Sequence, residues 1–246
     1  MSWCDKLASV PSVGFGLDWH FATADSALMA LSPLLDGLVS DGKPNFNVNR
    51  NDSFSFSIGL QDGFTYGVEP SKISVGFQHT LKARPVSGGP PVMEMLSAPL
   101  PYTKLLSDSC DRLEQITLMM PKIRERSINR VGIVSNTAVD LDEAPPGIIK
   151  FIKYLNNPWG DNSVEGFSIQ IVSIIKKEKE FTDRCTHILN KIDEKNSLVN
   201  LSFDWHRIYK SGLAINSKNI QNLLEGAQLD GLKYFEDLAE GALFDE

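Results

Sequence analysis

The sequence predicts an α+β protein in which an antiparallel sheet packs against long helices. Many segments alternate apolar and polar residues with a period of two, which is typical of half-buried strands. Other segments repeat apolar residues three and four positions apart, which is typical of amphipathic helices. The predicted elements also occur twice in the order β-α-β-β-β-α, at a spacing of roughly 110 residues, which indicates a tandem duplication.

The first unit begins with a strand over residues 13–22. Thr23 or Asp25 is expected to cap the helix that follows, and Pro33 is expected to bend it. Three strands joined by tight turns come next, and a helix then closes the unit before Pro121. The strands are expected at 54–60, 64–68 and 73–81, and the closing helix at 103–120.

The second unit begins with a strand over residues 128–139. Pro145 and Pro146 are expected to open a short helix, because proline is favoured in the first helical turn. Three further strands and a final helical region complete this unit. They are expected at 167–173, 185–189, 199–206 and 217–242. The two units would span residues 1–124 and 125–246, with one continuous domain as the alternative.

An Asp-Trp-His tripeptide occurs in two of the predicted strands. Period-two alternation places Trp on the apolar face of each strand and Asp and His together on the other face. If the two strands were neighbours, their polar side chains could bind zinc, iron or manganese. The four candidate ligands are Asp18, His20, Asp204 and His206. The alternative is that they only form the wetted faces of two strands. The tripeptides hold different positions in the two units, so chance recurrence and adjacency in one sheet both stay open.

The composition is that of an ordinary globular protein, with 42% hydrophobic and 22% charged residues. No apolar stretch approaches the ~20 residues that span a bilayer. Trp3, Cys4 and Asp5 do not match the start of a signal peptide, so we expect a cytoplasmic protein without membrane contact. The net charge of −7 argues against nucleic acid as a direct ligand. The three cysteines, Cys4, Cys110 and Cys185, are odd in number and widely spaced, which excludes a disulfide framework.

The familiar catalytic and cofactor signatures are missing from the sequence. There is no G-x-S-x-G, no Walker-type phosphate loop, no G-x-G-x-x-G, no H-E-x-x-H and no paired C-x-x-C. Their absence favours a protein without enzymatic activity and without a cofactor, although catalytic triads can assemble from distant residues.

Three features favour contact with a partner protein. The final helix is amphipathic, and the sequence from Glu225 onward is acidic, with Lys233 as its single basic residue. A basic run follows the helix that ends before Pro121; its alternative role is to stabilise the helix dipole. The stretch 83–101 is rich in proline and glycine and is expected to be the longest loop, of the kind that often binds. The predicted contact residues are Tyr234, Phe235, Leu238, Lys122, Arg124 and Arg126.

Three short segments resemble a family of uncharacterised, sporadically distributed bacterial proteins. They are Arg-Val-Gly-Ile at 130–133, Leu-Ser-Phe-Asp at 201–204 and Tyr-Phe-Glu at 234–236. The resemblance implies a bacterial protein from a mobile or defence-related gene neighbourhood. It implies no activity and no functional residues.

These features are consistent with three functions. The first is a non-enzymatic subunit or adaptor of a bacterial intracellular complex, which binds another protein or itself. The second is a small-ligand-binding module whose curved sheet encloses an apolar cavity. The third is a metal-dependent enzyme that uses the polar residues of the two tripeptides. The cavity of the second hypothesis would be lined by aromatic residues that otherwise form the core: Phe54, Phe56, Phe64, Tyr66 and Phe77.

Overall fold

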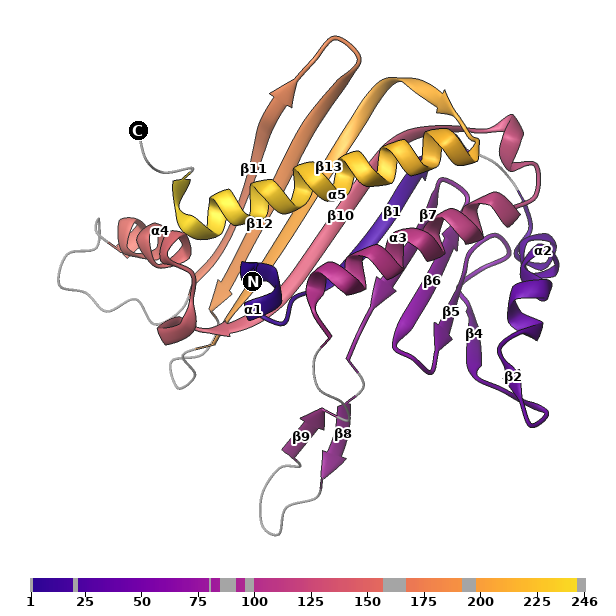
Figure 1. Cartoon of the computed structure of the whole chain (residues 1–246), viewed down its shortest axis with the longest axis horizontal. Coiled ribbons are helices and arrows are strands. Elements are labelled where there is room, and N and C mark those ends of the chain that lie inside the picture. The colour runs from indigo at the N-terminus through magenta and orange to yellow at the C-terminus, as the bar shows by residue number, and fades with distance from the viewer. Residues whose placement is uncertain are drawn as a thin grey trace.

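The computed structural model describes residues 2–19, 22–79, 81–84, 92–95, 100–156, 167–191 and 198–242. Its main sheet is built from β1 (Val10–Leu17), β4 (Phe46–Arg50), β5 (Phe56–Leu60), β6 (Phe64–Glu69), β7 (Lys72–Phe77), β10 (Ser127–Asp140), β11 (Phe167–Lys177), β12 (Phe181–Lys191) and β13 (Leu198–Ala214). These nine strands lie in the order β11-β12-β13-β10-β1-β7-β6-β5-β4, and every pairing is antiparallel. Helices cover one face of the sheet (Figure 1), which confirms the predicted α+β class.

The helices are α1 (Trp3–Lys6), α2 (Ala24–Asp36), α3 (Tyr102–Met119), α4 (Pro146–Asn156) and α5 (Ser217–Glu240), with 3-10 turns at Ile123–Glu125 and Leu141–Glu143. The predicted cap of α2 is confirmed, because the Thr23 side chain accepts a hydrogen bond from the Ser26 amide. At the other end of the chain, α5 is capped by Gly241, whose φ of 86° lies in the left-handed region that glycine adopts without strain. Within the described residues, none of the helices has the length and apolar character that crossing a bilayer requires.

The two halves of the chain meet at the centre of one sheet. There β1 pairs with β10, with Gly14 opposite Gly132, and β10 pairs in turn with β13, with Gly132 opposite His206. Each half contributes the strands on its own side of this junction. The apolar residues of both halves therefore face the same helical layer and belong to one core.

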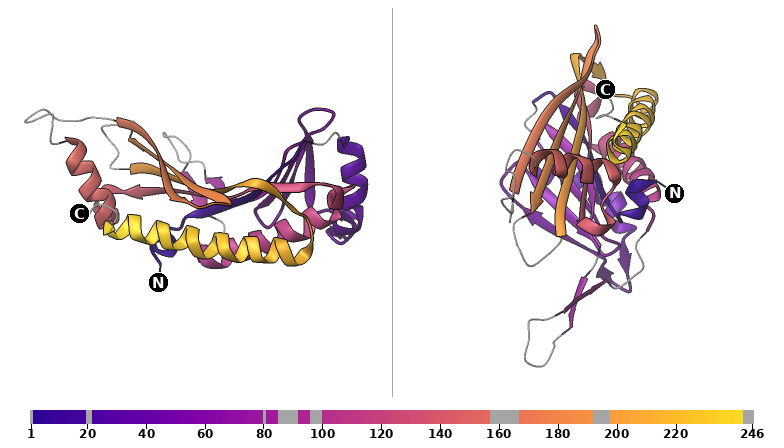
Figure 2. Two further views of the ribbon diagram at one scale, coloured as in Figure 1. Left: turned by 90° about the horizontal axis from the view of Figure 1, so that it is seen from above. Right: turned by 90° about the vertical axis from the view of Figure 1, so that its left-hand side faces the viewer.

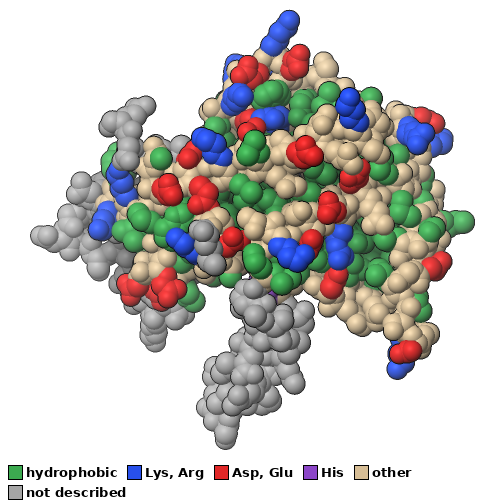
Figure 3. All heavy atoms as spheres, viewed as in Figure 1, with side chains coloured by type: hydrophobic (Ala, Val, Ile, Leu, Met, Phe, Trp, Pro, Cys, Tyr) green, Lys and Arg blue, Asp and Glu red, His purple; other side chains and the backbone are tan. Residues whose placement is uncertain are grey.

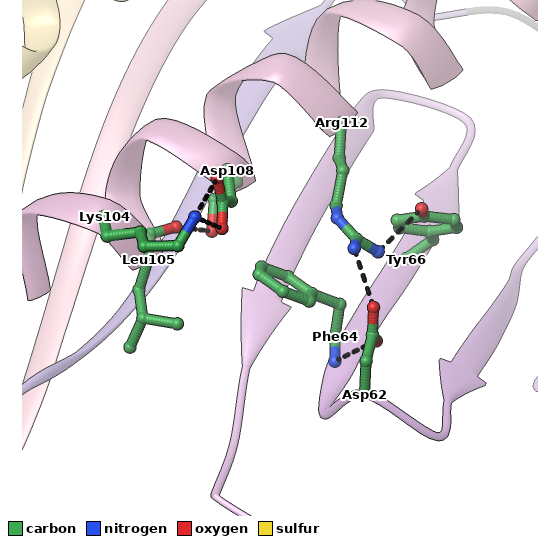
Figure 4. A network of polar contacts seen from close by, with 8 residues as sticks. Asp62, Phe64, Tyr66, Lys104, Leu105, Asp108 and Arg112 are labelled. Atoms are coloured by element: carbon green, nitrogen blue, oxygen red, sulfur yellow. Dashed lines mark hydrogen bonds and ion pairs between the residues drawn. The ribbon is translucent and has the colours of Figure 1, made fainter. Parts of the chain in front are cut away.

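On the N-terminal side, Arg112 joins α3 to the sheet (Figure 4). Its guanidinium donates to the Asp62 carboxylate at 2.7 Å and to the Tyr66 hydroxyl at 3.3 Å. The same group lies 3.9 Å above the centre of the Phe64 ring. These contacts fix the helix over the hairpin of β5 and β6, while the apolar side of α3, which includes Leu105 and Leu113, fills the core.

On the C-terminal side, α5 lies across the strands in a similar way (Figure 1). Arg207 on β13 donates to both oxygens of Asp183 at 2.7 Å and to Asp230 of α5 at 2.6 Å. Gly231 lets the helix approach closely, because a Cβ atom there would lie 3.2 Å from Ile133 and 3.7 Å from the Trp205 ring. The apolar side of this helix is thus used for packing within the chain.

The structure differs from the sequence prediction at three places. The predicted loop at 83–101 contains parts of two short paired strands, β8 (Leu81–Arg84) and β9 (Val92–Met95), while 85–91 and 96–99 lie outside the described residues. An additional strand, β4, borders the sheet, and β2 (Val39–Ser40) pairs with β3 (Lys43–Pro44) beside it. Neither segment has the apolar alternation that predicts a strand, because the residues of both are largely exposed.

The third difference concerns the first tripeptide. Strand β1 ends at Leu17, after a bulge, so Asp18 and Trp19 follow the strand instead of belonging to it. Trp19 is 62% exposed, whereas Trp205, in the middle of β13, is 1% exposed. The two tripeptides therefore occupy different structural positions.

Within the part of the chain that the structure describes, the face of the sheet opposite the helices carries no helix. Seen from above in Figure 2, the sheet bends so that its two ends turn away from α5. Its uncovered face is consequently concave. We call this surface the open face.

Candidate functional site

Two rows of side chains cross the open face, and each row takes one residue from every strand of the sheet. The strand registers define both rows without a gap. The first row is Ile174, Arg184, His206, Gly132, Gly14, Ser74, Gly67, Ser57 and Asn49. The second row is Val172, Thr186, Asp204, Val134, Ser12, Gly76, Thr65, Gly59 and Asn47.

From β1 to β4, both rows contain only glycine, serine, threonine and asparagine. We call this part of the open face the polar shelf. The curvature of the sheet explains part of the preference for small residues here, because bending a sheet towards one face crowds the side chains on that face. A Cβ atom on Gly14 would lie 3.1 Å from the Ile73 carbonyl oxygen, and one on Gly67 would lie 2.7 Å from the Ser74 hydroxyl. The shelf is smooth and uncharged, and it offers hydroxyl and amide groups to a ligand.

Cationic side chains gather beside the shelf, at the middle of the sheet. Lys72, Arg130, Asp204 and His206 border a hollow of about 490 Å³ that is open to solvent. Arg184 lies next to His206 in the first row. Lys72, Arg130 and Arg184 form no ion pair with the described residues. Among the described residues, the one ion-pair contact of the Asp204 carboxylate is with the His206 ring, at 3.6 Å. We call Lys72, Arg130 and Arg184 the cation cluster; they are a local excess of positive charge in a protein of net charge −7.

The predicted metal ligands are only partly adjacent. Asp204 and His206 share the open face of β13, as their alternation predicts. Asp18 lies elsewhere, because His206 is level with Gly14, four residues or about 13 Å back along β1. The Asp18 carboxylate instead accepts from the Ser127 amide at 3.0 Å. His20 lies outside the described residues, and the described part of the chain contains no group of three His, Cys, Asp or Glu residues placed to hold a metal ion.

The predicted partner-contact residues do not form one surface. On α5, Phe235 and Leu238 are buried in the core, and Tyr234 is turned towards the sheet. Arg126 is also buried, and its guanidinium donates to the Asp18 carbonyl at 2.5 Å and the Pro70 carbonyl at 2.6 Å. The physical reason is that an amphipathic helix first buries its apolar side within its own chain. Only Lys122 and Arg124 of this set follow α3 as exposed cations.

The aromatic residues predicted to line a cavity pack as a core instead. Phe56, Phe64, Tyr66 and Phe77 all belong to the buried cluster, and the Phe64 and Phe77 rings meet edge to face at 5.0 Å. Phe54 precedes β5 and is 37% exposed. None of the four hollows compared in the described residues is lined by these four side chains.

An apolar cavity does occur on the helix-covered side of the other half. It has a volume of about 200 Å³, is open to solvent, and lies between α4, α5 and the strands β11 and β12. Three polar groups reach it: Ser173, His187 and Tyr234. The Nε2 atom of His187 lies 3.2 Å from the Tyr234 hydroxyl, which lies 3.5 Å from the Ser173 hydroxyl. This site could not be predicted from the sequence, because His187 alternates with apolar residues like any core position.

Burial of His187 makes stability depend on pH. Desolvation lowers the pKa of its imidazole from 6.5 to about 4. Between these values the unfolded chain binds a proton that the folded chain does not, so the free energy of unfolding falls as the pH falls. We expect His187 to account for roughly 2–3 kcal/mol of the unfolding free energy that is lost between neutral pH and about pH 4.5.

Urea unfolding of the wild-type protein and of His187→Phe at both pH values measures this contribution. Carboxylates titrate in both proteins. The diagnostic quantity is therefore the difference between the two proteins in how much unfolding free energy each loses on acidification. An equal loss in both proteins would show that His187 is not the group responsible.

No family model matches this sequence, and searches of curated proteins and of solved structures found no match. The candidate sites therefore rest on the geometry of the chain itself.

Proposed function

We propose that this protein is a non-enzymatic subunit or adaptor of an intracellular complex, and that its open face docks an acidic segment of a partner protein. The observation that carries the proposal is the concave, uncovered face, which pairs a smooth polar shelf with the cation cluster. A partner segment can lie against the shelf because glycine and serine leave its backbone accessible. Its carboxylates would meet Lys72, Arg130 and Arg184.

The charge distribution supports an acidic partner segment. On the helix-covered face, acidic and basic side chains are interspersed, without a large patch of one sign in the view of Figure 3. The exposed cations of α5 and α3 are partly paired, as Lys233 is with Asp237 at 3.1 Å and Lys104 with Asp108 at 3.1 Å. The cation cluster is unpaired by comparison, so a carboxylate placed there gains a charge-assisted hydrogen bond without displacing an existing one.

Protein is favoured over nucleic acid as the partner. Nucleic-acid binding relies on many cations along a backbone and on aromatic side chains that stack with bases. The two rows of the open face contain one arginine and no aromatic side chain other than His206. The net charge of −7 would also repel a polyanion at long range.

The state of the cysteines is consistent with a role other than catalysis. Cys4, Cys110 and Cys185 are free and buried. Burial raises the pKa of all three thiols, that of Cys110 to about 12, so they are protonated and weakly nucleophilic at neutral pH.

We also propose that the concave sheet arose by tandem duplication of one β-α-β-β-β-α unit, with the two copies at 1–124 and 125–246. Phe64 and Phe181 each open the middle strand of a three-strand group, and an arginine lies above each ring, at 3.9 Å for Arg112 and 4.0 Å for Arg207. Each phenylalanine is also paired with an aromatic residue on the next strand, Phe77 in one case and Tyr209 in the other. A pair of such units joined at β1 and β10 supports one continuous open face. The resemblance to a sporadic bacterial family belongs to the same proposal.

Charge reversal tests the proposed function. The tagged double variant Lys72→Glu with Arg130→Glu is expressed in the native host beside the wild-type protein, and the proteins retained with each are quantified. We expect the wild-type protein to retain an acidic partner, and the double variant to lose it at least tenfold, which corresponds to about 1.4 kcal/mol. Raising the salt concentration should weaken wild-type retention as well, because the contact is charged and partly exposed.

The matched control is Lys218→Glu, which reverses an exposed charge in the first turn of α5, away from the open face. It should leave retention unchanged. Thermal unfolding of all variants confirms that each is folded. Equal retention by the wild-type protein and a folded double variant would contradict the proposed function.

A further inference from the structure

The outermost strand of the sheet on the C-terminal side is β11, and the proposed docking of an acidic segment makes no use of its outer edge. This strand stands at one end of the nine-strand order, so its outer side pairs with no other strand in the described part of the chain. We infer that two copies of this protein associate by pairing their β11 strands antiparallel about a two-fold axis, which joins the two sheets into one. This inference is independent of the proposed function, and each can fail without the other.

Strand β11 exposes a run of apolar side chains at the edge of the sheet. Val172 and Ile174, which both lie on the open face, are 60% and 59% exposed, and Ile171 and Ile175 beside them are exposed as well. No charged residue and no proline occurs from 167 to 175. Proteins usually protect an edge strand with such residues, because its free backbone N–H and C=O groups are a template for another strand. The edge formed by β11 is therefore suited to strand pairing.

The opposite edge of the sheet, which is formed by β4, is protected against pairing. It has five residues, whereas β11 has eleven. It contains Asn47 and Asn49 and ends at Arg50, whose guanidinium is ion-paired with Asp25. Short length and polar or charged side chains are the usual means of keeping an edge from pairing. With one edge protected and the other accessible, the sheet favours a closed pair of copies over an open-ended array.

The exposed segment of β11 is complementary to itself, which is why we infer a second copy as its partner. Residues 171–175 read Ile-Val-Ser-Ile-Ile, so the apolar residues are arranged symmetrically about Ser173. When Ser173 of one copy lies opposite Ser173 of the other, Val172 of each copy faces Ile174 of the other. Facing residues of antiparallel strands point to the same side of the sheet, so these four β-branched side chains form one cluster of cross-strand pairs. The pairing thus covers the two most exposed apolar side chains of each edge.

The charges at the end of β11 favour the antiparallel direction. Lys176 and Lys177 follow the bulge after Ile174. In the antiparallel pair, Lys176 of each copy lies near Gln170 of the other, so the two Lys176 residues are about 20 Å apart along the strands. Charges at this distance are screened, because the Debye length is roughly 8–10 Å. Parallel pairing would place them about 5 Å apart across the strands, where they repel. In Figure 1 the second half of β11 extends past α4, so this helix leaves it accessible.

Sedimentation equilibrium of the purified full chain tests the inference. We expect the average mass to rise from that of a monomer to that of a dimer as the protein concentration rises, with no larger species, because β4 is protected. Val172→Lys places a charge against Ile174 of the other copy and should raise the dissociation constant of the dimer at least about tenfold. The matched control, Val48→Lys, makes the same change on β4 and should dimerise as the wild-type protein does. Thermal unfolding confirms that both variants are folded.

Disulfide formation between cysteine variants tests the two-fold pairing and its register. The Cα atoms of facing residues lie about 5 Å apart, which is within the range that a disulfide spans. A mixture of Val172→Cys and Ile174→Cys should therefore crosslink into dimers under mild oxidation. Each variant alone should crosslink little, because the same residue in the two copies lies diagonally across the strands, at roughly 7–8 Å. The three native cysteines are buried and do not compete.

Three results would each overturn the inference. They are a purified wild-type protein that stays monomeric up to its solubility limit, a folded Val172→Lys variant that dimerises as tightly as the wild-type protein, and equal crosslinking in the mixed and the single cysteine samples. The first result includes the case in which β11 pairs only with a strand of a different protein. None of the three bears on the docking of an acidic segment at the open face, which is tested by charge reversal at Lys72 and Arg130.

Discussion

Replacing Arg207 with methionine is expected to lower the free energy of unfolding by about 3–5 kcal/mol. Arg207 makes a bidentate contact with Asp183, and the Asp183 residue is 3% exposed. Methionine preserves most of the apolar stem but leaves this carboxylate buried without a cation. The contact to Asp230 would also be lost, and with it one of the polar links between α5 and the sheet. Chemical denaturation at neutral pH measures the effect.

A surface ion pair provides the control. Lys233 and Asp237 are one helical turn apart on α5, and the lysine side chain is 74% exposed. Lys233→Met should therefore cost less than about 0.5 kcal/mol. Replacing both Arg207 and Asp183 with apolar residues should cost less than Arg207→Met alone, because no buried charge is left unpaired. If Arg207→Met were as mild as Lys233→Met, the buried network would not support α5.

The two tripeptide tryptophans should respond very differently to truncation. Trp205→Ala is expected to cost about 3–5 kcal/mol, because it removes a large, fully buried side chain beneath α5 and leaves a cavity next to Gly231. Trp19→Ala is expected to cost less than about 1 kcal/mol, because Trp19 is 62% exposed. The same residue in two copies of one tripeptide thus provides an internal control for burial.

Thermal and urea unfolding of both variants measure this contrast. The slope of unfolding free energy against urea should stay constant, since neither change alters the surface exposed on unfolding by much. Similar losses for Trp205→Ala and Trp19→Ala would show that the first tripeptide is buried as well, and would contradict the end of β1 at Leu17.

Sequence periodicity predicted the central elements because burial on one face is a local property. Residues 54–60, 64–68 and 73–81 alternate clearly, and β5, β6 and β7 lie within or close to these ranges. The cap at Thr23 is also local. Strand β4 escaped prediction because it is an exposed edge strand whose side chains do not alternate in burial.

Pairing between distant strands could not be predicted from the sequence. Asp204 and His206 share a face, as alternation requires, but only the registers of β1, β10 and β13 show that Asp18 lies several residues away from them. Likewise, Phe235 and Leu238 were visible as the apolar side of a helix. Whether that side meets a partner or its own sheet depends on tertiary packing, and it meets the sheet.

The candidate sites were only partly visible in the sequence. Ser12, Gly14, Ser74 and Gly76 alternate with apolar residues, so small polar residues on one face could be recognised strand by strand. Their alignment into rows that cross nine strands depends on register. The same is true of the cation cluster, whose members come from β7, β10 and β12.

The most direct test of the central claim is a zero-length crosslink between amines and carboxylates in the native complex, mapped by mass spectrometry. If the open face docks an acidic segment, Lys72 should crosslink to aspartate or glutamate of a partner protein, and the link should disappear at high salt. Crosslinks from a partner only to lysines of the helix-covered side, such as Lys104 or Lys233, would contradict the account.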